Sequence, residues 1–82
     1  MNADDFYAAM TDFLGERLRA DADDVPAAIT AQQDLVEAGL LDSLRVIQMI
    51  ARAEELTGGT VDLAETDLES LYSLEGLYAA VR

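Results

Sequence analysis

Apolar residues recur at helical spacing along most of this chain, and that spacing limits the possible fold more than any other feature. Between Asn2 and Arg19 the apolar positions fall at i, i+4, i+7, i+8 and i+12, which places one apolar stripe along a helix. They are Phe6, Met10, Phe13, Leu14 and Leu18. Asn2 is a suitable N-cap, and Arg17 lies in the last turn, where the helix dipole favours a cation. The first element is therefore predicted to be a helix.

A second long helix is predicted from Ser43 to Leu56. Asp42 precedes it as a good N-cap, and Gly58 and Gly59 interrupt the pattern at its far end. Residues 20–33, between the two helices, show no sustained period and contain the only proline of the chain. We therefore expect a long and mostly irregular loop between helices one and two.

Two shorter helices are predicted in the last third of the chain. Thr66, with Glu69 three residues later, has the form of a capping box, so a short third helix is expected to begin there. Ser73 can cap a fourth helix, whose apolar face is made of Leu74, Leu77, Tyr78 and Val81. The predicted fold is all-α: a four-helix bundle with a long first loop and a short third helix.

The size and composition of the chain agree with a small folded domain. Eighty-two residues allow a single domain, residues 1–82, and 51% hydrophobic residues are enough for a core. The chain has no cysteine and no histidine, which excludes disulfides, thiolate or imidazole metal ligands and the usual Ser-His and Cys nucleophiles. We expect a protein that is not an enzyme.

The acidic character of the chain limits its partners and its location. Seventeen acidic residues against five basic ones give a net charge of -12, which repels nucleic acid and anionic membranes. Asp4 and Asp5 stand where a signal peptide needs positive charge, and no apolar run is long enough to span a membrane, so a cytoplasmic location is expected. We also expect a monomer. Asp21 begins an acidic cluster, but Pro26 and Gln32 stand where a calcium loop needs Gly and Glu, so no metal site is predicted.

The second predicted helix carries two apolar stripes. At about 100° per residue, one side is assigned to the core and groups Val46, Met49, Ile50, Ala53 and Leu56. The other side carries Leu44, Ile47 and Ala51, with Gln48, Glu54 and Glu55 at its border. Two interpretations stay open: the helix is buried on both sides, or the second stripe is an exposed docking surface with an acidic rim. We predict that the second stripe is exposed.

Ser43 lies beside the second stripe at the start of this helix. Free backbone N–H groups and the positive end of the helix dipole favour a phosphate at such a position. No histidine is available to activate the hydroxyl, so Ser43 is better interpreted as a residue that another enzyme modifies.

The segment Gly39-Leu40-Leu41-Asp42-Ser43-Leu44 resembles the attachment segment of acyl and peptidyl carrier proteins. The resemblance covers nearly the whole chain in length, acidity and order of helices. It implies that Ser43, flanked by Asp42 and Leu44, receives 4'-phosphopantetheine from coenzyme A. Acyl, aminoacyl or peptidyl groups are then carried as thioesters on the terminal thiol.

The same resemblance implies the partners of the chain. They are a phosphopantetheinyl transferase, an adenylating ligase or acyltransferase, and downstream condensing or tailoring enzymes. The expected docking residues are Leu44, Ile47, Ala51, Gln48, Glu54 and Glu55.

Arg45 refines the resemblance, because fatty-acid-synthesis carriers usually have an acidic residue at this position. The run from Gly39 to Leu44 is more similar to the corresponding segment of D-alanyl carriers and freestanding peptidyl carriers. This similarity favours an aminoacyl or short-acyl cargo in nonribosomal peptide or related secondary metabolism. D-alanylation and fatty-acid or polyketide synthesis are alternatives.

A further alternative is a small acidic helical interaction module without a prosthetic group, in which Ser43 is only part of a helix start. Arg45 itself either pairs with nearby carboxylates or contacts a phosphate or a partner.

Overall fold

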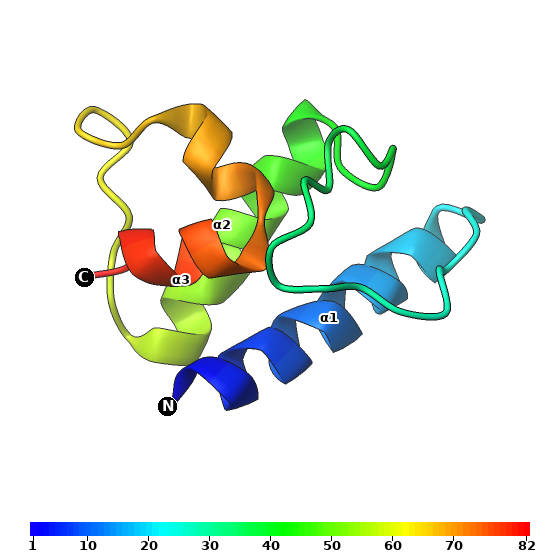
Figure 1. Ribbon diagram of the computed structural model, residues 1–82, viewed down its shortest axis with the longest axis horizontal. Coiled ribbons are helices and arrows are strands. Elements are labelled where there is room, and N and C mark those ends of the chain that lie inside the picture. Colours follow the sequence, from blue (N-terminus) through cyan, green and yellow to red (C-terminus); the bar gives the residue numbers. More distant parts are fainter.

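The computed structural model describes all 82 residues and contains only helices and connecting segments (Figure 1). The α-helices are α1 (Ala3–Ala20), α2 (Ser43–Thr57) and α3 (Leu74–Ala80), and one 3-10 helix, η1 (Leu68–Tyr72), precedes α3. The expected all-α class is confirmed. The expected four-helix bundle is not, because the third predicted helix is the 3-10 turn η1 and three α-helices remain.

The cap residues explain why the third element stays a 3-10 turn. The side chain of Asp67, not that of Thr66, accepts a hydrogen bond from Glu69 N at 3.2 Å, so the predicted capping box is wrong. Ser73 then caps α3 by accepting from Gly76 N at 3.1 Å. Only five residues lie between these two caps, too few for a stable stretch of i to i−4 bonds.

The core lies where the three α-helices meet, since each of them contacts the other two. The stripe on α1 and the predicted core side of α2 both face inward, and three leucines of η1 and α3 close the core. The buried apolar side chains are Phe6, Met10, Leu14, Leu18, Leu35, Leu41, Val46, Met49, Ile50, Ala53, Leu71, Leu74 and Leu77. Phe13 and Leu56, which the spacing also assigned to apolar faces, are only half-buried.

The long loop returns from the far end of α1 to the start of α2 (Figure 1). Buried Leu35 anchors it: Leu35 N donates to Tyr72 O at 2.9 Å, and Leu35 O accepts from both Leu40 N and Leu41 N. Glu75 N also donates to Ala31 O at 2.9 Å. The irregular loop is thereby fixed to η1 and α3, which determines where α2 begins.

The connection after α2 is closed by the end of the chain. Gly58 ends α2 in a left-handed conformation with φ 72°, and its N–H donates to Glu54 O. Thr60 and Arg82 then exchange two backbone hydrogen bonds, of 2.8 and 2.9 Å. The C-terminus therefore lies against this connection (Figure 1). None of the helices combines the length and the apolar character that crossing a bilayer requires.

Candidate functional site

Ser43 is the exposed first residue of α2, and its surroundings follow from the cap that precedes it. Asp42 is extended, its side chain accepts from Arg45 N at 2.9 Å, and its carbonyl accepts from Val46 N at 2.9 Å. The N–H groups of Ser43 and Leu44 make no hydrogen bond within the chain. Two backbone donors at the positive end of the helix are thus free beside the Ser43 hydroxyl.

The second stripe of α2 is exposed, as predicted. Leu44 is 64% exposed and Ile47 62%, and Ala51 is exposed as well. The opposite face of the helix forms part of the core. The interpretation in which α2 is buried on both sides is therefore wrong.

A groove of about 480 Å³ begins at Ser43 and runs between α2 and the segment that carries η1. Seven of its nine lining residues are hydrophobic, among them Ile47, Leu63, Leu68 and Tyr72. Leu63 is 57% exposed and Leu68 52%. The sequence did not predict these two leucines as site residues, because their place in the groove depends on how the segment after α2 folds back against that helix.

The two glutamates of the acidic rim expected around the second stripe already form a hydrogen bond and an ion pair within the chain. Glu54 is half-buried and accepts a hydrogen bond from Val61 N at 3.0 Å. Glu55 is exposed and pairs with Arg52 at 2.9 Å. Gln48 is half-buried at the border of the stripe. Glu54 thus connects the end of α2 to the segment that follows it, whereas Glu55 pairs within its own helix and faces solvent.

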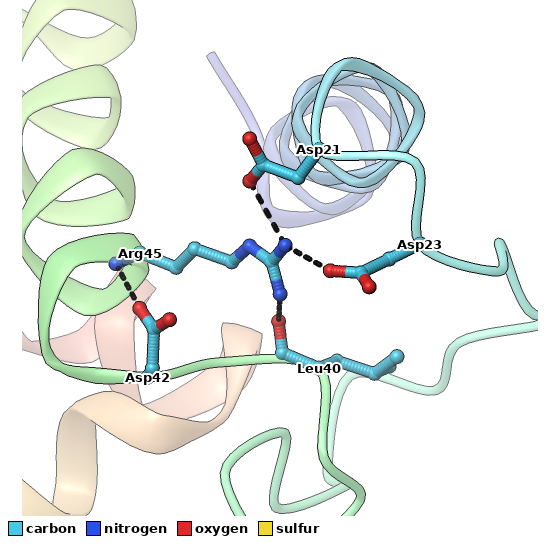
Figure 2. Close-up of polar contacts among 5 residues, drawn as sticks. All are labelled: Asp21, Asp23, Leu40, Asp42 and Arg45. Carbon is cyan, nitrogen blue, oxygen red and sulfur yellow. Dashed lines mark hydrogen bonds and ion pairs between the residues drawn. The ribbon is translucent and has the colours of Figure 1, made fainter.

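Arg45 pairs with the acidic cluster at the start of the long loop (Figure 2). Its guanidinium donates to Asp21 at 2.9 Å, to Asp23, and to Leu40 O at 3.4 Å, and its side chain is only 11% exposed. Hydrogen bonds to Asp23 and then to Asp21 raise the pKa of Arg45 above its already high ordinary value. Of the two roles left open for Arg45, pairing with nearby carboxylates is confirmed.

These features fit a phosphodiester on Ser43. The hydroxyl is exposed, two free N–H groups can donate to phosphate oxygens, and an apolar groove lies alongside. The carboxylates nowhere gather into a group of three or more that could hold a metal ion.

The comparison with protein families agrees with this geometry. Residues 8–81 match the family described as phosphopantetheine attachment site. The chain belongs to this family of acyl and peptidyl carrier proteins. No curated protein and no solved structure matched the chain.

Family membership gives the general role of the domain. Carrier domains of this family bind 4'-phosphopantetheine covalently on a serine. They are generally non-catalytic and interact with a phosphopantetheinyl transferase and with catalytic enzymes. The chain is therefore a phosphopantetheine carrier.

Proposed function

We propose that this carrier holds its phosphopantetheine on Ser43 and delivers aminoacyl, peptidyl or short acyl groups to partner enzymes. The hydrogen bonds of the three serines support this choice. Ser70 Oγ donates to Asp67 O at 2.6 Å, and Ser73 Oγ accepts from Gly76 N as the cap of α3. Ser43 alone has an exposed hydroxyl with no hydrogen bond within the chain.

The attachment step needs a separate transferase. Ser43 Oγ forms a bond to the phosphorus of coenzyme A that carries the pantetheine, the bond to the 3',5'-ADP portion breaks, and the nucleotide leaves. No side chain of the carrier is hydrogen-bonded to Ser43 Oγ, and the chain has no histidine, so the transferase must accept the serine proton. The N–H groups of Ser43 and Leu44 are placed to donate to the phosphate oxygens. The group, once attached, supplies the thiol on which cargo travels as a thioester.

Two features at the start of α2 support an aminoacyl or short-acyl cargo loaded by an adenylating ligase. The first turn of α2 contains no acidic residue, and Arg45 within that turn forms ion pairs with Asp21 and Asp23. An enzyme that recognises a carrier by carboxylates in this turn therefore has no carboxylate to contact there except that of the cap residue Asp42. We place the carrier in nonribosomal peptide or related secondary metabolism, acting in the cytoplasm as a monomer.

Modification at a single serine is the direct test of the proposed attachment. The wild-type protein, Ser43→Ala and the control Ser70→Ala are incubated with coenzyme A and a broad-specificity phosphopantetheinyl transferase, and intact masses are measured. We expect one phosphopantetheine on the wild-type protein and on Ser70→Ala, and none on Ser43→Ala. Phosphopantetheine on the Ser43→Ala protein would show that another residue is the site.

The cargo is tested with a panel of loading enzymes. The holo protein is offered to purified aminoacyl-adenylating ligases and to fatty-acyl-loading enzymes, and initial rates of thioester formation are compared. We expect an adenylating ligase to be fastest. Faster loading by the fatty-acid enzymes would contradict the proposed cargo and leave the attachment site unaffected.

A further inference from the structure

A second cleft opens on the other side of the exposed stripe, between α1 and α2. It encloses about 230 Å³ and is lined by Phe13, Arg17, Gln48, Ala51, Arg52 and Glu55. Ala51 belongs both to this cleft and to the exposed stripe, so the two surfaces are continuous. A protein seated on the stripe therefore reaches the cleft.

The cleft contains an unpaired positive charge. Arg52 lies over the Phe13 ring, 5.6 Å from its centroid, and pairs with Glu55 at 2.9 Å. The side chain of Arg17 forms no ion pair or hydrogen bond, and its Nε is buried without a partner. The residue is half-buried. Two arginines against one glutamate leave the cleft one positive charge in excess, in a molecule whose net charge is -12.

We infer that this cleft receives a carboxylate side chain of the adenylating ligase that docks on Leu44, Ile47 and Ala51. The inference rests on the proposed function, which supplies that ligase. One unpaired guanidinium matches the single charge of a carboxylate, and the arginine fork fits its two oxygens. A doubly charged phosphate would be left half-neutralised and repelled by the acidic remainder of the surface.

The charge arrangement gives the cleft a role in orientation. A partner with a generally basic surface is attracted to this molecule in many orientations, because acidic residues occur all along the chain. When the partner covers the stripe, a carboxylate at the edge of its contact surface is favourable over Arg17, which lines the cleft beside Ala51, and unfavourable against the acidic residues. The cleft therefore favours the orientation in which the partner covers the stripe and its carboxylate lies over Arg17.

The test compares two arginines of the same helix turn. Arg17→Gln removes the charge in the cleft, and Arg19→Gln removes the same charge from an exposed residue that does not line it. Both variants and the wild-type protein are converted to the holo form, and their thermal midpoints are compared to confirm folding. KM and kcat are then measured for the ligase that loads the wild-type carrier fastest.

For Arg17→Gln we expect the KM of the carrier to rise about three- to ten-fold with kcat unchanged. For Arg19→Gln we expect KM to change by less than about two-fold. Arg17→Lys should fall between wild type and Arg17→Gln, because lysine keeps the charge and loses the fork. High NaCl should remove most of the difference. Equal KM values for Arg17→Gln and Arg19→Gln would overturn the inference. Failure of the proposed function appears earlier and separately, as a wild-type protein that is not modified or not loaded.

Discussion

At the scale of single residues, Arg45 joins two parts of the chain that are far apart in sequence. Its partners Asp21 and Asp23 precede it by 24 and 22 positions and lie at the end of α1 and in the loop. The pairing fixes the beginning of the long loop to the first turn of α2 (Figure 2). Ser43 is the first residue of that turn. A side chain that the family resemblance connected with partner choice thus has a structural role.

Replacement of Arg45 is expected to destabilise the fold. Arg45→Gln should lower the free energy of unfolding by about 1–2 kcal/mol, since it removes charge-assisted bonds to two carboxylates that are themselves half-exposed. Arg45→Asp should cost more, because a third carboxylate then meets Asp21 and Asp23. Urea unfolding curves measure both, with Arg19→Gln as the control that loses a charge and no ion pair. An unchanged curve for Arg45→Gln would show that the pairing contributes nothing to stability.

Tyr7 makes the stability of the fold depend on pH in the alkaline range. Burial, followed by the nearby Glu75, Tyr78 and Asp4, raises the pKa of Tyr7 above its ordinary value of 10.0. The folded protein thus holds this proton more tightly than the unfolded chain does. The contribution to stability is complete below about pH 10 and is lost as the pH rises through the folded-state pKa.

Spectroscopy at high pH tests the Tyr7 prediction. Phenolate absorbance of the folded protein should include a phase above pH 10, and Tyr7→Phe should remove that phase. Unfolding curves across the same range should show a smaller loss of stability in Tyr7→Phe than in the wild-type protein. If Tyr7→Phe removed no phase above pH 10, the raised pKa of Tyr7 would be contradicted.

At the scale of elements, α2 was the most predictable part of the molecule. Asp42 and Gly58 are strong local signals, so the predicted helix from Ser43 to Leu56 differs from the observed one by a single residue. Its two faces follow from periodicity alone. η1 was not predictable in the same way, because neighbouring caps compete there and the choice depends on tertiary contacts. The partners of Arg45 and the groove beside Leu63 and Leu68 depend on how the loops fold back, which spacing along a helix does not encode.

Substitutions on the two faces of α2 should separate docking from stability. Ile47→Glu places a carboxylate on an exposed position and should change stability by less than about 0.5 kcal/mol while slowing transferase modification and cargo loading. Ile50→Glu, one helical turn away and only 7% exposed, buries that carboxylate and should cost more than about 3 kcal/mol. Circular dichroism melting measures stability, and initial rates measure docking. Normal loading of the Ile47→Glu protein would exclude this face as the docking surface.

At the scale of the whole molecule, acidic residues far outnumber basic ones, and few of them form ion pairs. Only two of the five arginines, Arg45 and Arg52, form ion pairs, and these involve Asp21, Asp23 and Glu55. Most of the 17 acidic residues have no cationic partner. The folded state brings these charges closer together than the unfolded chain does, so mutual repulsion opposes folding, while the same field attracts basic partners.

Salt should therefore stabilise this carrier. Raising NaCl to physiological strength shortens the Debye length to about 8 Å and screens repulsion between exposed carboxylates, so the thermal midpoint at neutral pH should rise by a few degrees, roughly 2–6 °C. Salt also weakens the Arg45 pairs, an opposing effect that Arg45→Gln removes. The midpoint of Arg45→Gln should accordingly rise more steeply with NaCl than that of the wild-type protein. Differential scanning calorimetry of both proteins gives the two slopes. A wild-type midpoint that falls with moderate salt would mean that the few specific pairs outweigh the repulsion among the many unpaired carboxylates.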